Sequence, residues 1–164
     1  MRTEQGFTLV ELLITVVVLS ILVALAVPNF RGLMDRNAVV TQANDLISGI
    51  LLARSEAIKR ELPVVIRQVG SWNTQWIVFN DLNGNNNYNS ATEAPRILNN
   101  QQTANSVTIT GANNAATFIR FNSRGRATMA PGEDSFTITR NSSTRYICFS
   151  ATGRPRVQED PSCQ

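Results

Sequence analysis

The sequence contains no histidine, which removes the commonest general base and metal ligand of proteins. Lysine is nearly absent as well, so arginine supplies almost all of the positive charge behind the net charge of +3. No nucleophile stands beside a base, and Gly84, Gly125 and Gly153 lie in turn-like segments rather than in a phosphate-binding loop. We therefore expect a protein that is not an enzyme and that binds no cofactor or metal.

Charge is missing from one long stretch near the N-terminus. Residues 7–27 carry a single charged side chain, Glu11, and end just before Pro28. This is about the 20 residues that a helix needs to cross a hydrocarbon core. A carboxylate inside hydrocarbon costs at least about 2.5 kcal/mol and is rarely left unpaired. The stretch therefore belongs in a membrane or inside an assembly, where Glu11 needs a partner.

The short polar leader and the start of the apolar stretch, Gly6-Phe7-Thr8-Leu9-Val10-Glu11-Leu12-Leu13, resemble type IV prepilins and type II secretion pseudopilins. This resemblance implies that a prepilin peptidase cleaves after Gly6 and N-methylates Phe7. It also implies that Glu11 pairs with the new N-terminal amine, either of its own Phe7 or of a neighbouring subunit. An ordinary signal anchor with one tolerated acid is the alternative.

Helical spacing of apolar residues resumes after Pro28 and stops at Leu62-Pro63, which predicts one bent helix of roughly 50 residues. We expect its first half not to pack against the head, whereas its second half is amphipathic and packs on a sheet. We expect the packed side to contain Phe30, Leu33, Val40, Ala43, Ile47, Ile50, Leu51, Arg54 and Ile58. Polar residues mostly off that side are Asp35, Arg36, Gln42, Asp45, Ser48 and Glu56.

Beyond Pro63 the pattern changes to the two-residue alternation of strands. Strands are predicted at residues 64–69, 75–80, 106–110, 117–122, 135–139 and 145–150. The fold class is therefore α+β: a long N-terminal helix packed on a mostly antiparallel sheet, as in the type IV pilin fold. We expect residues 1–6 as leader, 7–35 as the transmembrane and assembly helix, and 36–164 as one periplasmic globular head.

An asparagine-rich segment, residues 80–89, separates two of these strands. Its oxygen-bearing side chains suggest a calcium loop, but Asn86 and Thr92 stand where an EF-hand needs glycine and a bidentate acid. An exposed turn explains the composition without a ligand. The order of Trp76, Asp81, Gly84, Glu93 and Arg96, and the segment 121–126, resemble the minor pilin and pseudopilin group that includes FimT, FimU and GspH.

The two cysteines, Cys148 and Cys163, lie near the C-terminus. A head that the anchor sends into the oxidising periplasm favours a disulfide between them, which would stabilise the fold by roughly 3 kcal/mol in the chain-entropy model. A metal pair is the poorer alternative, since no further ligand completes a site.

The segment Gly153-Arg154-Pro155-Arg156 is the most informative part of the tail. Glycine and proline limit regular structure, and residues two apart in an extended piece point the same way. Two guanidinium forks on one face can grip phosphate oxygens. The segment resembles the Gly-Arg-x-Arg tail through which FimT-type minor pilins bind DNA, which implies phosphate contacts at Arg154 and Arg156.

Several alternatives stand beside that implication. FimU-type subunits with a similar tail serve chiefly in assembly, and Glu159 and Asp160 could pair with the two arginines. Further arginines could extend the basic patch if the sheet brings them near; these are Arg124, Arg126, Arg140 and Arg145. Trp72, Trp76 and Tyr146 are the candidates for stacking on bases, although alternation places them in the core.

Together these resemblances imply a minor type IV pilin, similar to FimU and FimT, that assembles into the pilus tip or primes it. The alternatives are a DNA-binding minor pilin for natural transformation and a GspH-like minor pseudopilin of type II secretion. The expected partners are other major and minor pilins, the prepilin peptidase, the inner membrane and, for the second alternative, double-stranded DNA. The precursor would lie in the bacterial inner membrane with a periplasmic head and then move into the filament.

Overall fold

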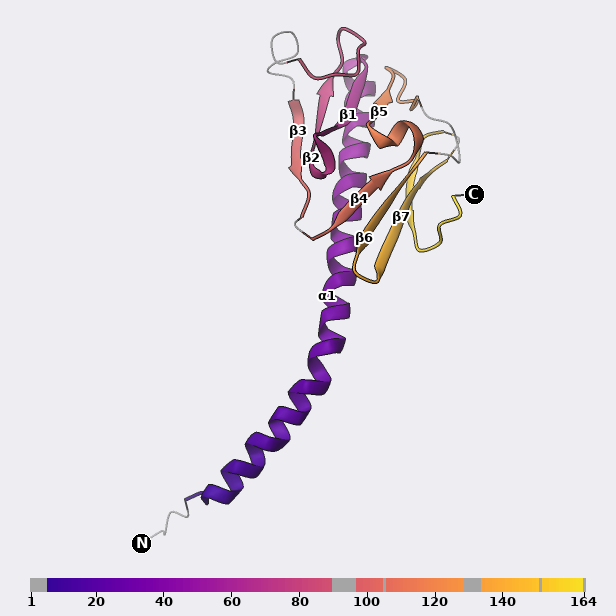
Figure 1. Cartoon of the computed structure of the whole chain (residues 1–164). Coiled ribbons are helices and arrows are strands. Elements are labelled where there is room, and N and C mark those ends of the chain that lie inside the picture. The colour runs from indigo at the N-terminus through magenta and orange to yellow at the C-terminus, as the bar shows by residue number, and fades with distance from the viewer. Residues whose placement is uncertain (1–5, 90–96, 105, 129–133, 151, 164) are drawn as a thin grey trace. The chain divides into compact units, whose positions relative to one another are not determined.

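The computed structural model describes residues 6–89, 97–104, 106–128, 134–150 and 152–163 (Figure 1). The chain divides into two compact units, Met1–Met34 and Asp35–Gln164. Most of the expected leader, residues 1–5, lies outside the described residues, as do Glu93 and Arg96. The assignment of residues 7–35 to the membrane and 36–164 to the periplasm stays a prediction.

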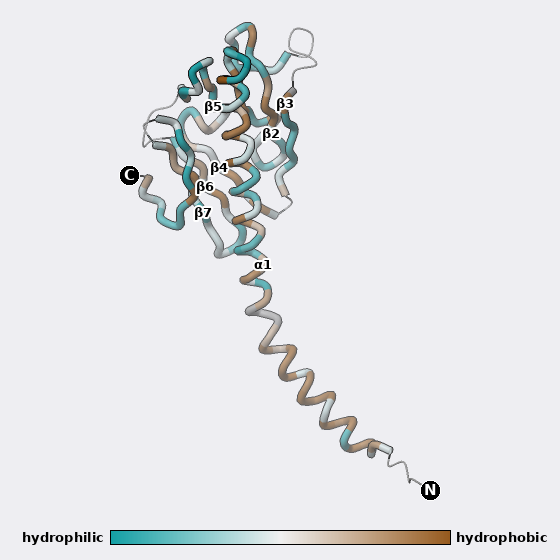
Figure 2. Tube along the Cα trace, turned by 180° about the vertical axis from the view of Figure 1, so that it is seen from behind, coloured by the Kyte–Doolittle hydropathy of each residue, from teal (hydrophilic) through white to brown (hydrophobic). Residues whose placement is uncertain are grey.

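One helix, α1 (Leu9–Arg60), contributes to both units. It continues through Pro28 and ends just before Leu62-Pro63, as the sequence predicts. In the first unit its large apolar side chains, from Leu9 to Leu25, are about half exposed or more. Figure 2 colours most of this part of α1 as hydrophobic. By length and composition α1 is able to cross a membrane.

In the second unit, one stripe of α1 is buried against the sheets. Its members recur at intervals of three and four residues: Val39, Ala43, Leu46, Ile50, Ala53 and Ala57. The predicted stripe was therefore partly wrong, because Leu51 and Ile58 are exposed and the small Ala53 and Ala57 face inward. Alanines let the strands approach the helix closely, which the large side chains would prevent.

Two polar residues expected on the outer side of the helix are also buried. Gln42 is 2% exposed and accepts the backbone N–H of Ala104 through Oε1 at 2.8 Å. Asp35 pairs with Nε of Arg140 at 2.8 Å and accepts from the side chain of Asn141 at 2.7 Å. Each of them ties the helix to a loop or strand end of the second unit.

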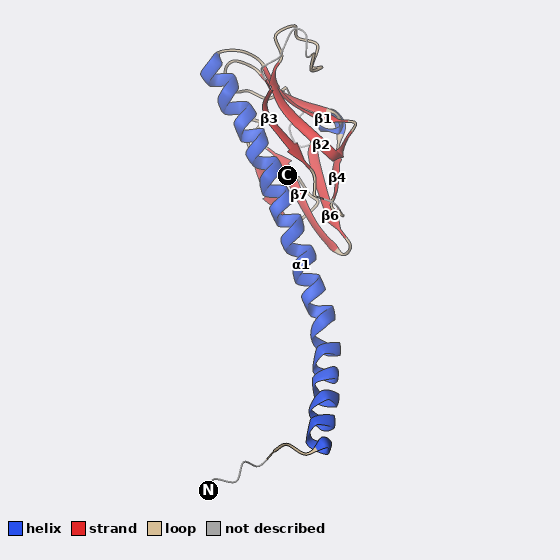
Figure 3. Ribbon diagram, turned by 90° about the vertical axis from the view of Figure 1, so that its left-hand side faces the viewer, coloured by secondary structure: helices blue, strands red, loops and turns tan. Residues whose placement is uncertain are grey.

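The strands form two four-stranded antiparallel sheets rather than the single sheet expected (Figure 3). The first has the order β3-β2-β1-β5, made of β1 (Val64–Val69), β2 (Ser71–Asn80), β3 (Ile97–Gln102) and β5 (Phe118–Phe121). The second has the order β4-β6-β7-β8, made of β4 (Thr108–Gly111), β6 (Ser135–Arg140), β7 (Ser143–Phe149) and β8 (Pro155–Gln158). The sequence predicted neither β3 nor β8.

Side chains, not a backbone ladder, join the two sheets where β2 and β4 meet. The N–H of Ile109 donates to Oδ1 of Asn73 at 2.5 Å, so a side chain of β2 satisfies the backbone of β4. The rings of Trp72 and Phe136 meet edge to face with centroids 5.0 Å apart. Both sheets and the buried stripe of α1 therefore share one core.

Candidate functional site

Glu11 lies at the start of α1 and closes a capping box. The N–H and hydroxyl of Thr8 both donate to Oε2 of Glu11 at 2.9 Å, and the N–H of Glu11 donates to the Thr8 hydroxyl at 3.2 Å. This reciprocal pairing satisfies two backbone donors that a helix start leaves open. Sequence reasoning overlooked the Thr-x-x-Glu pattern, although its spacing is visible in the chain.

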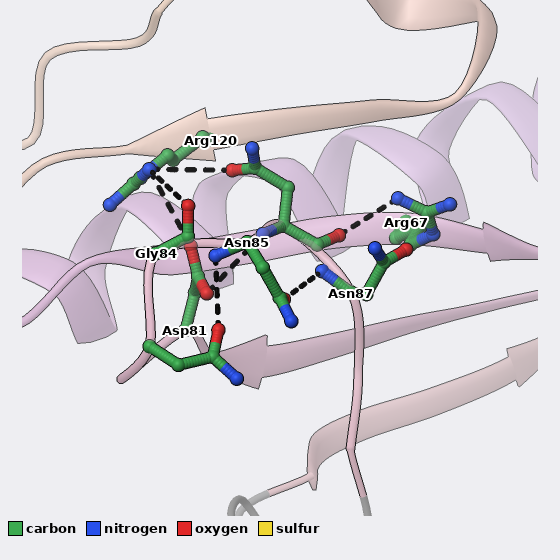
Figure 4. A network of polar contacts seen from close by, with 8 residues as sticks. Arg67, Asp81, Gly84, Asn85, Asn87 and Arg120 are labelled. Carbon is green, nitrogen blue, oxygen red and sulfur yellow. Dashed lines mark hydrogen bonds and ion pairs between the residues drawn. The ribbon is translucent and has the colours of Figure 1, made fainter.

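Polar contacts hold the asparagine-rich segment after β2 in place, some within the segment and some from neighbouring strands (Figure 4). Asp81 is buried, and Arg120 on β5 reaches its carboxylate at 3.6 Å. Arg67 on β1 donates to the carbonyl of Asn86 at 2.8 Å, and the N–H of Asn87 donates to Oδ1 of Asn85 at 2.7 Å. An ion pair and side-chain turns therefore hold this loop on the outer face of the first sheet.

The tail arginines, Arg154 and Arg156, flank the start of β8. Both are exposed, and the buried Pro155 lies between them. The tail is more regular than expected, because Pro155 to Gln158 pair with Phe149 to Tyr146 at the edge of the second sheet. Proline is tolerated there, since an edge strand leaves one side of its backbone unpaired.

The turn that precedes β8 is tightly built. The N–H of Gly153 donates to the carbonyl of Ser150 at 2.8 Å, and the N–H of Arg154 donates to the Ser150 hydroxyl at 3.1 Å. Gly153 has a φ of +75°, and a Cβ there would lie 2.7 Å from the side chain of Ala127. Only glycine fits both the backbone conformation and this close approach.

The acidic residues near the tail, Glu159 and Asp160, each have a partner within the described chain. Glu159 pairs with Arg145 at 2.7 Å. Asp160 accepts from both the backbone N–H and the hydroxyl of Ser162, and these bonds, the backbone one first, lower the pKa of its carboxyl. Cys148 of β7 and Cys163 form a disulfide, which closes the end of the chain onto the second sheet.

A cleft of about 400 Å³ lies beside the turn that precedes β8 and is lined by three arginines. Arg54 comes from α1, Arg124 and Arg126 from the turn after β5, and Thr152 from the turn before β8. We call this site the arginine cleft. It brings together residues that are far apart in the sequence, and two of them, Arg124 and Arg126, were expected to extend the basic patch.

The other two arginines expected in the patch form ion pairs outside the cleft. Arg140 pairs with Asp35, and Arg145 pairs with Glu159. Sequence reasoning did not connect Arg54 with the patch; the available signal was a charged residue on the apolar side predicted for the helix. Trp72 and Trp76 are 2% and 1% exposed, so their rings are not available for stacking on bases.

Comparisons with known proteins give consistent results. The family described as Type II transport protein GspH matches residues 42–153, and the prokaryotic N-terminal methylation motif matches residues 1–27. Two crystal structures of the type IV minor pilin FimU of Pseudomonas aeruginosa share the fold. The P21 form has a TM-score of 0.56 and 23% identity, over 79% of this chain and 92% of FimU.

The P65 form of the same pilin has a TM-score of 0.57 and 20% identity, over 76% of this chain and 98% of FimU. Comparison with individual curated proteins gives no significant match.

Proposed function

Because the chain belongs to the GspH family of type II transport proteins, we propose that it is a minor pilin that enters a filament through α1 and acts at the pilus tip. The observation that carries this proposal is the exposed apolar stretch of α1 from Leu9 to Leu25, in which Glu11 is the one charged residue. Such a surface requires a membrane before assembly and other apolar helices after it. The N-terminal methylation motif supports the same route.

Assembly then follows from the chemistry of the helix start. Cleavage after Gly6 would leave an amine on Phe7, close in sequence to the carboxylate of Glu11. Inside a helix bundle of low dielectric, a carboxylate is stable only beside a cation, so an amine from a neighbouring subunit would fix the axial register. The head, residues 36–164, would then contact other minor subunits.

We expect Glu11→Ala to leave the precursor in the membrane but to reduce the chain recovered in sheared filaments at least tenfold. Glu11→Gln separates two roles, because glutamine preserves the capping box but carries no charge. It should therefore impair incorporation as strongly as Glu11→Ala. The measurement is immunoblotting of filament and membrane fractions from the bacterium that encodes the chain.

Thr8→Ala is the matched control, since it removes the cap and keeps the carboxylate. It should lower incorporation far less than either change at Glu11. Normal recovery of Glu11→Gln in filaments would contradict the proposed register mechanism. Co-purification of the chain with secretion pseudopilins instead of pilins would assign it to a type II secretion system, as a GspH-like minor pseudopilin.

A second candidate function is binding of double-stranded DNA during natural transformation. The observation in its favour is the exposure of both tail arginines on either side of the buried Pro155. The hydrogen bonds of Gly153 and Arg154 to Ser150 fix the start of this segment, so less freedom is lost on binding. Arginine forks in this arrangement are suited to phosphate oxygens.

The test is binding of a labelled DNA duplex to the mature chain in detergent micelles over a series of salt concentrations. If the tail arginines contact phosphates, Arg154→Ala together with Arg156→Ala should weaken binding and reduce the slope of log K against log salt by about two. Arg36→Ala, which changes an exposed arginine on α1, is the control and should leave the slope nearly unchanged. Absence of binding by the folded, oxidised chain would leave assembly as the function.

A further inference from the structure

The arginine cleft contains positive charge that no ion pair among the described residues neutralises. Arg60, Arg120, Arg140 and Arg145 each form an ion pair with an acid. Within the described part of the chain, Arg54, Arg124 and Arg126 form none, and no acidic side chain lines the cleft. Three guanidinium groups around one cleft repel each other, and an anion placed between them would relieve that repulsion.

The turn that carries two of these arginines is rigid before any ligand arrives. Oδ1 of Asn122 accepts the backbone N–H groups of both Arg124 and Arg126 at 3.0 Å. Gly125 has a φ of +70°, and a Cβ there would lie 2.5 Å from Cδ1 of Ile58 on the helix. The two arginines are thus held against α1, and a partner would lose little free energy in ordering them.

Apolar surface adjoins the cleft. Leu51 and Ile58 are 45% and 50% exposed, and they lie three residues before and four residues after Arg54, hence on the same face of α1. A phosphate backbone gains nothing from such apolar groups, whereas a protein partner buries them. Arginine is also enriched at protein interfaces relative to the rest of the surface.

We propose that the arginine cleft, together with Leu51 and Ile58, is a docking site for a segment of another filament subunit that carries carboxylates next to an apolar side chain. The carboxylates enter between the three arginines, and the apolar side chain covers Leu51 and Ile58. This inference rests on the proposed function, since it names the partner surface for a chain that assembles with other subunits.

The test uses the full chain in the bacterium that encodes it. A photoreactive phenylalanine analogue in place of Leu51 should form an adduct with another filament subunit, and mass spectrometry of the adduct should place the cross-link within a few residues of Asp or Glu. The double change Arg54→Glu with Arg126→Glu should reduce both the adduct and the incorporation of the chain into filaments at least tenfold.

Arg36→Glu with Lys59→Glu is the matched control, because it changes net charge equally on the same helix but lies outside the cleft. It should leave the adduct within twofold of the unchanged chain. Arg124→Glu, at an exposed turn position, replaces the double change if the latter lowers the amount of folded chain in the membrane. The fluorescence of the two buried tryptophans reports folding.

Three results would overturn the inference: no adduct from position 51, an adduct remote from any acid, or an adduct unaffected by the arginine changes. Loss of DNA binding in the Arg54→Glu and Arg126→Glu chain, with normal incorporation, would also overturn it and assign the cleft to nucleic acid. If Glu11→Gln blocks incorporation and the cleft variants do not, this inference fails while the proposed function stands. Normal incorporation of the Glu11→Gln chain would instead contradict the proposed function itself.

Discussion

Replacing Gly49 with valine is expected to destabilise the second unit by about 3 kcal/mol, at the upper end of the cost of overpacking a core. Gly49 lies inside α1 directly beneath the ring of Trp76, and any Cβ would overlap Cη2 and Cζ3 of that ring. Trp76 is 1% exposed in the shared core, so the ring has no free space to move into. The added side chain must therefore displace the helix from the first sheet.

The presence of glycine at this position is itself informative. Glycine in the middle of a helix costs about 1 kcal/mol relative to alanine. The fold accepts this cost because the large ring of Trp76 occupies the space of the missing side chain, so the loss of helix propensity is offset by ring burial. Gly49→Ala should consequently destabilise the fold, although it would stabilise an exposed helix.

Equilibrium unfolding of the mature chain in guanidinium chloride, followed by tryptophan fluorescence, measures the effect, because Trp72 and Trp76 are the two tryptophans and both are buried. Ser48→Val is the matched control, since it places the same side chain one residue away on the exposed face of α1. It should change the free energy of unfolding by no more than about 0.5 kcal/mol. Equal stability of the two variants would contradict the packing described for Gly49.

Much of the fold could be predicted because local patterns and global packing agree. Strand β1 matches its predicted range, since Pro63 and Gly70 bound a run of apolar residues that a sheet buries. Strand β3, in contrast, consists largely of asparagine and glutamine and lacks apolar alternation. It is a strand because β2 supplies the partners for its backbone hydrogen bonds. Its own side chains carry no pattern from which this pairing could be predicted.

The face of the helix was mispredicted for a related reason. Large apolar residues were taken to mark the buried side, but Leu51 and Ile58 are exposed while Ala53 and Ala57 are buried. Size predicts burial only where the opposing surface leaves room, and here the strands lie close to the helix. The exposed Leu51 and Ile58 are then free to form part of a docking site.

The arginine cleft lay beyond the reach of sequence patterns. Arg54 meets Arg124 and Arg126 because the turn after β5 returns to the helix and Gly125 contacts Ile58. Local sequence patterns do not show which residues distant in the chain come into contact, so they could not predict this cluster of arginines. The tail arginines were accessible to sequence reasoning, since their two-residue spacing is local.

Removing the disulfide is expected to lower the free energy of unfolding of the second unit by about 3 kcal/mol. The chain-entropy model gives this value for a loop of about 15 residues, because the cross-link restricts the unfolded chain far more than the folded one. The sequence separation between Cys148 and Cys163 is 15. Replacing both with alanine avoids leaving a free thiol, and the same guanidinium titration measures the loss.

The disulfide should also act locally on β8. This edge strand has four residues and, among the described strands, pairs with β7 alone. Beyond it, Cys163 is tied to β7 by the disulfide and Glu159 by the ion pair with Arg145. Without the cross-link, hydrogen exchange should accelerate more at the amides of β8 than at those of the central strand β6. Exchange that accelerates equally in both strands would show that the disulfide contributes only to global stability. The position of the tail arginines would then depend on the turn at Ser150 and Gly153 and not on the disulfide.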